Sequence, residues 1–222
     1  MSTKRSKRYQ EAAKLVTPNK NYSITEAVET MKSFPAPKFD PTVTVSFHLT
    51  VDPRKSDQMV RGSVSLPNGT GKNVRVLVFA QGDAAKAAQE AGAEFVGFED
   101  LIKKVQGGFV DFDTAIATPD AMTEVRKVAR VLGPRGLMPN PKTGTVTDDT
   151  AKAVKEVKAG RVDYKVDKNA NISAAVGKLS FSNESIAETT AALIDSLVNA
   201  RPASAKGAHI ESVTVSGAAS PA

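Results

Sequence analysis

The chain has 222 residues and no cysteine, so it can bury a core but cannot form disulfide bonds or cysteine metal sites. Apolar residues make up 41% of the chain, which is a globular composition, and no apolar run is long enough to span a membrane. The N-terminal segment lacks the apolar stretch of a secretion signal, so we expect a cytoplasmic protein.

The net charge of +6 is concentrated in the first third of the chain. Residues 1–69 carry eleven lysines and arginines against six acids, residues 70–159 carry 13 against 12, and residues 160–222 carry six of each. Clustered positive charge favours a polyanionic partner, because each neutralised phosphate releases counterions. A solvated basic surface explains the same excess, so charge alone leaves both interpretations open.

The first third predicts helices followed by a strand with two unlike faces. Its first twenty residues are polar and basic and predict a frayed helix; Ser23 then begins a helix over 24–33, with Glu26 as its capping-box partner. Residues 42–51 alternate between apolar and small polar side chains, which predicts one buried face and one hydroxyl-rich face. We expect residues 63–66 to form a short partner strand.

The middle of the chain alternates short apolar strands with helical segments. Strands are predicted at 74–80, 94–97 and 113–118, and helices at 83–91, 99–106, 120–131 and 148–158. This alternation is typical of a parallel sheet with helices on both faces.

The antiparallel pattern returns after Gly160. We expect a hairpin of strands 161–167 and 171–177, a helix over 183–200 capped by Asn183, and a last strand at 209–217. The two patterns predict an α+β domain with an antiparallel sheet that is discontinuous, made of 1–69 plus 160–222. It is interrupted by an α/β insert domain, 70–159, with glycines at both junctions to serve as hinges.

The segment GPRGLMPNPKTGTV, residues 133–146, has the glycines and cations of a phosphate-binding loop, an RNA contact or a rigid scaffold. A phosphate-binding loop requires glycine directly before Lys-Ser or Lys-Thr, and Lys142-Thr143 lacks it. His48 and His209, the only histidines, stand alone in predicted strands, and no nucleophile motif is present. We therefore expect no catalysis, no metal and no cofactor.

Two segments have the chemistry of an RNA contact. Residues 52–62 offer Arg54, Lys55 and Arg61, whose charges can bind phosphates, although ion pairs with the neighbouring acids are an equal alternative. Lys38 and Phe39 precede the hydroxyl-rich strand, and Ser212 in the last strand can extend its polar face. The residue type alone favours a core position for Phe39.

Several segments, in this order, resemble the ribosomal protein L-one family of the bacterial large subunit. They are KFD at 38–40, DPRKSDQ-x-VRG at 52–62, LPNGTGK at 66–72, LGPRGLMPNPKTGTV at 132–146, KAGR at 158–161, DK at 167–168 and AKG at 205–207. The resemblance covers nearly the full chain, and the segment at 132–146 is similar to the signature of that family.

The resemblance implies a Rossmann-like insert in a discontinuous α+β domain, and a non-enzymatic component of the cytoplasmic ribosome. It implies binding to the large-subunit rRNA stalk, assistance in releasing tRNA from the exit site, and repression of translation through the chain's own operon mRNA. The RNA-binding positions it implies are Lys38, Phe39, Thr42, Asp167, Lys168 and Ser212. Arg54, Lys55 and Arg61 lie in a matching motif, and the signature loop contains Gly133, Pro134, Arg135, Gly136, Pro139 and Pro141.

One departure from the family pattern lies at the C-terminus. Similar proteins follow the last strand with Thr-Met-Gly against the RNA, where this chain has Ala218, Ala219 and Ser220. The competing hypothesis is a nucleotide- or small-molecule-binding α/β protein with incidental basic termini. It needs a phosphate-binding loop after residues 74–80, where the carboxylate of Asp83 would repel a phosphate.

Overall fold

The computed structural model describes residues 5–17, 20–205 and 207–221. The chain divides into two compact units, one made of the residues up to Gly71 together with those from Val162 onward, and one of Lys72–Arg161. Antiparallel strands dominate the first unit and parallel strands the second. Within the described ranges, no helix has the length and apolar character needed to cross a bilayer.

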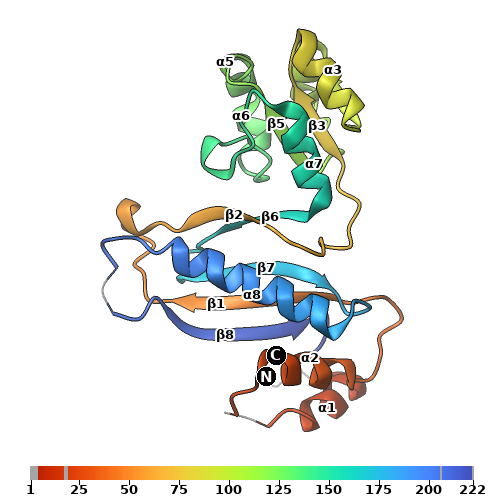
Figure 1. Ribbon diagram of the computed structural model, residues 1–222, viewed down its shortest axis with the longest axis vertical. Helices are drawn as coiled ribbons and strands as arrows, with labels where there is room; N and C mark the ends of the chain where they lie inside the picture. The colour runs from red at the N-terminus through yellow and green to blue at the C-terminus, as the bar shows by residue number, and fades with distance from the viewer. Residues whose placement is uncertain (1–4, 18–19, 206, 222) are drawn as a thin grey trace. The chain divides into compact units, whose positions relative to one another are not determined.

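The first unit is built on a three-stranded antiparallel sheet with the order β7-β1-β8 (Figure 1). These strands are β1 (Thr42–Leu49), β7 (Asn171–Lys178) and β8 (Ile210–Gly217). The helices are α1 (Lys7–Lys14), α2 (Ile24–Lys32) and α8 (Asn183–Asn199), with a short 3-10 turn, η1, at Ser56–Gln58. Of the expected N-terminal helix, α1 is observed, whereas residues 1–4 and 18–19 lie outside the described ranges.

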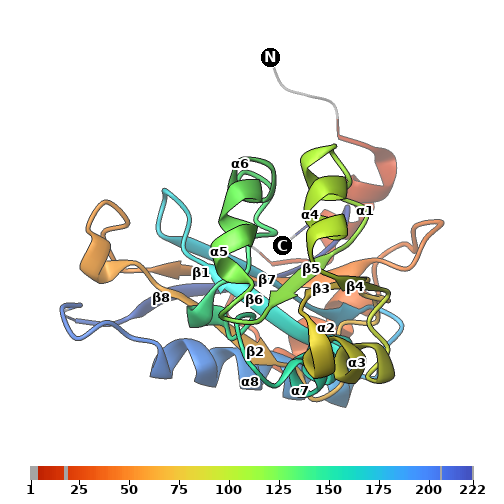
Figure 2. The ribbon, with the colours of Figure 1, turned by 90° about the horizontal axis from the view of Figure 1, so that it is seen from above.

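The alternation predicted for 42–51, of which 42–49 form β1, sets the two faces of this sheet. Val43, Val45, Phe47 and Leu49 are at most 1% exposed and pack with α2 and α8, while the residues between them are half-buried. Figures 1 and 2 both show α8 lying along one face of the three strands. The opposite face of β1 is therefore left with hydroxyl and imidazole groups.

Two expectations about strand pairing are wrong. The short strand near 63–66, β2 (Arg61–Ser65), pairs with β6 (Arg161–Lys165) and not with β1, because β7 and β8 already occupy both edges of β1. The second wrong expectation is the hairpin: β6 pairs with β2 and β7 pairs with β1, so β6 and β7 belong to different sheets. Only the turn between them remains, where the N–H of Asp167 donates to the Asn171 carbonyl over 2.8 Å.

The capping-box prediction for α2 is confirmed, and the cap of α8 is shifted by one residue. Ser23 accepts from the Glu26 N–H, and the Glu26 carboxylate accepts from the Ser23 N–H. For α8 the cap is Ser182, and not Asn183, because Ser182 has the extended backbone and its hydroxyl accepts from the Ser185 N–H over 3.0 Å.

The second unit has a three-stranded parallel sheet with the order β4-β3-β5. Its elements are β3 (Val76–Phe79), α3 (Gly82–Glu90), β4 (Phe95–Gly97), α4 (Glu99–Gln106), β5 (Thr114–Ala117), α5 (Met122–Val125), η2 (Arg126–Val128), α6 (Ala129–Leu132), η3 (Pro141–Thr143) and α7 (Thr150–Gly160). Figure 2 shows α4, α5 and α6 on one side of the strands and α3 and α7 on the other.

Side chains of β3 point alternately into two cores, which explains its continuous apolar run. Leu77 and Phe79 pack in the hydrophobic core that the sheet forms with α4, α5 and α6. Val76 and Val78 pack in the hydrophobic core that it forms with α3 and α7. The helix expected over 120–131 is divided by the 3-10 turn η2. That tighter turn places buried Val125 and Val128, three residues apart, on the same side.

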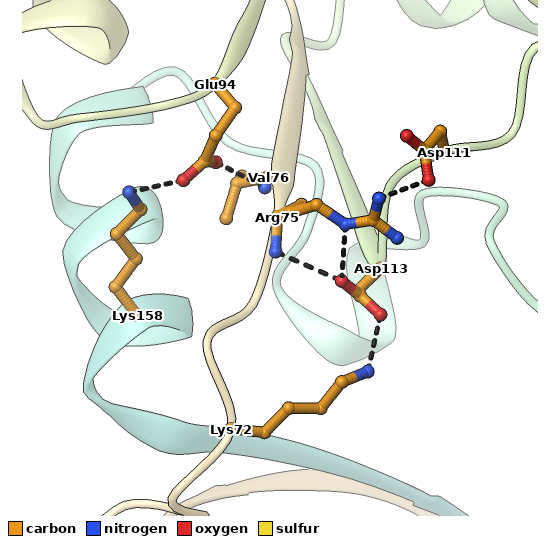
Figure 3. A network of polar contacts seen from close by, with 7 residues as sticks. All are labelled: Lys72, Arg75, Val76, Glu94, Asp111, Asp113 and Lys158. Atoms are coloured by element: carbon orange, nitrogen blue, oxygen red, sulfur yellow. Dashed lines mark hydrogen bonds and ion pairs between the residues drawn. The ribbon is translucent and has the colours of Figure 1, made fainter.

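A network of polar contacts holds the start of β3 in place (Figure 3). Lys72 donates to Asp113 over 2.5 Å, and Arg75 contacts both Asp113 and Asp111. On the other side, the Glu94 carboxylate accepts from the Val76 N–H over 2.7 Å and from Lys158 over 2.8 Å. The hydrogen bond from Lys72, ahead of those from Arg75, lowers the pKa of Asp113 to about 2.

Candidate nucleic-acid interface

Three rows of residues cross the face of the β7-β1-β8 sheet that is turned away from the core. From one end to the other they are Ala175, Thr44 and Ser216; Ser173, Ser46 and Thr214; and Asn171, His48 and Ser212. The hydroxyls of Ser46 and Ser173 are 2.9 Å apart, and His48 Nδ1 is 2.7 Å from Asn171 Oδ1. Small hydrogen-bonding groups on a flat sheet can contact RNA sugars and phosphates. We call this surface the polar face.

Three of the expected RNA-binding positions lie at or just before the N-terminal end of β1; they are Lys38, Phe39 and Thr42. Lys178 of β7 donates to the Thr42 hydroxyl over 3.1 Å, so a cation stands directly beside that hydroxyl. The Asp40 carboxylate accepts from the hydroxyl of Ser180 over 2.7 Å, which fixes the segment leading into the strand. Lys38 is exposed on the same segment.

Phe39 lies on the surface, so the interpretation of it as a core residue is wrong. It is 55% exposed, whereas Phe47 of the same sheet is fully buried. The alternation of β1 begins at Thr42, and therefore the strand pattern does not reach back to Phe39. An exposed aromatic ring that follows an exposed lysine, Lys38, is suited to stacking on an unpaired base.

The other three expected positions lie near the C-terminal end of β1; they are Asp167, Lys168 and Ser212. Ser212 stands opposite His48, and Asn171, on the other side of His48, follows the turn that carries Asp167 and Lys168. The Asp167 carboxylate accepts from the N–H groups of Asn169 and Asn171, each over 2.8 Å. The bond from Asn171, the strongest influence, lowers the pKa of Asp167. Asp167 thus orders the turn, and Lys168 is its exposed cation.

The loop after β1 presents Arg54 and Lys55, and β2 begins with Arg61; all three are exposed. Asp52 accepts from the backbone N–H of Arg54 over 3.1 Å, so it shapes the turn and does not pair with the arginine side chain. Within the described part of the chain, none of these three cations lies within ion-pair distance of a carboxylate. The ion-pair alternative for this segment is therefore wrong.

The two groups of expected positions lie at opposite ends of one face. Thr42 and His48 are six residues apart along β1, which corresponds to about 20 Å. Between them stand residues that sequence reasoning did not select, above all Asn171, Ser173 and Lys178. Their alternation with Ile172 and Ala174 marks a two-faced strand, but only the pairing register with β1 assigns them to this face.

The signature loop lies in the second unit and is largely structural. Its end extends the parallel sheet, because Ala117 pairs with Val146 and exchanges hydrogen bonds with Thr145 and Thr147. Pro139 is buried, whereas the remaining predicted loop positions are exposed: Gly133, Pro134, Arg135, Gly136 and Pro141. Gly144 has a φ of +62°, and a Cβ there would approach the Arg161 guanidinium to 2.6 Å.

The structure offers little support for a phosphate or metal site in the second unit. The N-terminus of α3 follows β3, but its first turn carries Asp83, whose exposed carboxylate disfavours an anion. No group of three or more potential metal-ligating side chains was found in the described ranges. In the first unit, His209 is 8% exposed, and burial lowers its pKa.

Comparison with known proteins agrees with the resemblance in the sequence. Residues 29–221 match the model of the ribosomal protein L1p/L10e family. The large ribosomal subunit protein uL1 of Corynebacterium glutamicum strain R is 53% identical over 219 residues, covering 99% of this chain and 93% of that protein. The protein of the same name from Corynebacterium kroppenstedtii is 56% identical over 214 residues, covering 96% and 90%.

Proposed function

The chain belongs to the ribosomal protein L1p/L10e family, whose members are structural ribosomal proteins and not enzymes, and from this premise we propose that it binds the stalk of large-subunit rRNA through the polar face. We propose further that it works within the cytoplasmic large subunit, as the names of its relatives indicate. The two units then serve as an RNA-binding α+β domain and a Rossmann-like insert domain.

The observation that carries this proposal is the make-up of the polar face. Over about 20 Å it presents hydroxyl, amide and imidazole groups, with the exposed Lys38, Phe39 and Lys168 at its ends. RNA is bound by such combinations, because hydroxyls reach the 2′-OH, lysines neutralise phosphates and aromatic rings stack on splayed bases. A small-molecule site would instead be concave and enclosed.

Each expected residue has a distinct role in this proposal. Phe39 stacks on a base, Lys38 and Lys168 neutralise phosphates, and the hydroxyls of Thr42 and Ser212 bond to the RNA backbone. Asp167 acts by ordering its turn, since its carboxylate is occupied by backbone N–H groups. The contributions of Arg54, Lys55 and Arg61 are electrostatic, because all three are exposed and lack ion-pair partners within the described part of the chain.

Two further roles rest on the family and on the same surface. We propose that the protein assists the release of tRNA from the exit site, and that it represses translation by binding its own operon mRNA. Both are compatible with a surface that binds the sugar-phosphate backbone and splayed bases. If rRNA and the operon leader occupy one surface, each should displace the other in a competition experiment.

A filter-binding titration with a stalk rRNA fragment at several salt concentrations tests the main proposal. We expect nanomolar affinity, and a slope of log affinity against log salt of about −2 to −4, as three or four phosphate contacts would give. Salt-insensitive binding would contradict the proposal.

A further inference from the structure

Arg8, on α1, connects two segments that border the polar face. Its Nη2 donates to the Ala219 carbonyl over 2.5 Å and its Nη1 to the Pro35 carbonyl over 3.4 Å. Pro35 begins the segment that carries Lys38 and Phe39, and Ala219 is the second residue after β8. Arg8 is half-buried in a narrow crevice that is also lined by Pro35, Pro41, Leu179, Gly217 and Ser220.

The C-terminal turn that Arg8 holds is joined to the polar face by the backbone. The N–H of Ala218 donates to the Thr42 carbonyl over 3.0 Å, so the turn begins beside Thr42. The turn is closed by Ser220, whose N–H donates to the Gly217 carbonyl over 3.1 Å and whose hydroxyl accepts from the Gly217 N–H over 3.0 Å. We call Gly217–Ser220 the C-terminal turn.

This turn needs support from outside itself. Ala219 has a φ of +61°, in the left-handed region that residues other than glycine rarely adopt. Such a backbone persists where surrounding contacts determine it. The hydrogen bond from Arg8 reaches the carbonyl of this same residue, from a helix more than two hundred residues away in the sequence.

We propose that Arg8 is a positioning residue of the RNA-binding surface, which joins the C-terminal turn to the Pro35–Phe39 segment and so sets the shape of the Thr42 end. The proposal rests on the RNA-binding function proposed above. Arg8 lies outside residues 29–221, which match the family model, so the match assigns it no role. Its guanidinium suits the task because a planar fork can donate to two carbonyls at once, which a lysine cannot do.

A direct contact between Arg8 and a phosphate is the competing explanation, and salt dependence separates the two. No carboxylate of the described residues lies within ion-pair distance of Arg8, so within those residues its charge has no ion-pair partner. Loss of a phosphate contact would reduce the salt slope by about one. Loss of a positioning contact weakens binding and leaves that slope unchanged.

The test is a double-mutant cycle in the full chain, with the stalk rRNA fragment as the probe. Its variants are Arg8→Ala, a chain that ends at Gly217, and the combination of both. We expect each single change to raise Kd about fivefold to thirtyfold, as the loss of one or two hydrogen bonds does. The combination should be no weaker than the truncated chain alone, because Arg8 would then have no turn to hold.

Two further variants sharpen the result. Arg8→Lys keeps the charge, and we expect it to bind as weakly as Arg8→Ala. Arg5→Ala is the matched control: among the described residues, the hydrogen bond and the cation–π contact of the Arg5 side chain are both with Tyr9 of α1, and loss of this side chain should leave Kd unchanged. Full binding by Arg8→Lys, additive losses in the cycle, or a salt slope reduced by one in Arg8→Ala would each overturn the proposal.

A measurement without RNA separates failure of this inference from failure of the proposed function. In the free protein, Arg8→Ala should speed amide hydrogen exchange at Ser220 at least about fivefold, because the turn loses an external contact. Unchanged exchange would refute the positioning role even if RNA binding fell. Absence of RNA binding by the unaltered chain would instead refute the proposed function, whatever Arg8 does in the free protein.

Discussion

Phe39 and Phe47 show that position relative to the alternating strand decides whether a phenylalanine side chain is buried or exposed. Phe47 lies on the inward face of β1 and is fully buried with Ile172 and Leu193 in the core. Phe39 lies three residues before the strand and exposes 55% of its surface. The two residues therefore offer a matched pair for separating binding from stability.

Phe39→Ala should weaken binding of the stalk rRNA fragment by about fivefold to a hundredfold, because a stacked base contributes about 1–3 kcal/mol. The melting temperature should fall far less than for a core phenylalanine, since more than half of the Phe39 surface is already exposed in the folded chain. The control, Phe47→Ala, should cost about 3–5 kcal/mol of unfolding free energy through the cavity it leaves. Filter binding and thermal melting of both variants decide the matter, and a destabilised Phe39→Ala would restore the core interpretation.

Asp113 predicts a pH dependence of stability. Its pKa in the folded chain is about 2, below the ordinary value of 3.8, chiefly because Lys72 donates to it. Its ionised form therefore stabilises the fold above pH 4, and this stabilisation is lost as the pH falls toward 2. Allowing for solvent screening, we expect a contribution of about 1–2 kcal/mol.

Urea unfolding of Asp113→Asn, followed by circular dichroism, measures this contribution. At pH 6 the variant should be less stable than the unaltered chain, and the difference should disappear near pH 2. Asp83→Asn, at a fully exposed carboxylate of the same unit that pairs only at the surface with Lys86, is the control and should change stability by no more than about 0.5 kcal/mol at either pH. A difference between Asp113→Asn and the unaltered chain that persists at pH 2 would show that the hydrogen-bond geometry, and not the charge, is responsible.

At the scale of elements, the pairing register of β1 creates the polar face. Ser46 is brought between Ser173 and Thr214, which are 127 and 168 positions away in the numbering. A shift of one residue in either pairing would turn the neighbouring strand's apolar side chains to this face. The surface thus depends on two long-range pairings and not on any single motif.

Thr214→Glu tests the central row of that surface. A carboxylate there would face the phosphates, so we expect at least about a tenfold loss of rRNA affinity with an unchanged fold, because like charges repel across an interface. Thr123→Glu in α5, an exposed position in the second unit, changes the net charge equally and should have little effect. Equal losses in the two variants, measured by filter binding, would mean that overall charge and not the polar face governs affinity.

At the scale of the whole molecule, the first unit is discontinuous in sequence but has its own core and sheets. Its two segments are joined by β2 pairing with β6, and by β1 pairing with both β7 and β8. The second unit has two cores of its own on either side of its parallel sheet. We therefore expect each unit to fold without the other.

Replacing residues 72–161 by a short glycine-serine linker should leave rRNA affinity within about threefold and the salt slope unchanged, because all proposed contacts lie in the first unit. The pairing of β2 with β6 keeps the joined ends close together. The separate fragment 72–161 should show cooperative thermal unfolding and no rRNA binding. A folded deletion variant that no longer binds would move the site into the second unit.

The sequence by itself determined most of the local structure and the family. Alternation in 42–49, the capping box at Ser23 and the alternating strands and helices of the middle all rest on short-range periodicity and hydrogen bonding, which are legible in a few residues. Seven ordered motifs identified the family, and the family match confirmed it. The resemblance to that family suggested Lys38, Thr42 and Lys168 as RNA-binding positions, and their role stays a prediction.

Only the tertiary structure decided which strands pair and which side chains share a face. The short strand β2 joined β6, Phe39 remained outside the core, and Asn171, Ser173 and Lys178 came to the polar face. The tertiary structure likewise decided that Arg8 of α1 donates a hydrogen bond to the C-terminal turn. Such outcomes depend on competition between distant segments for the two edges and the one buried face of β1, and periodicity within a segment carries no information about that competition.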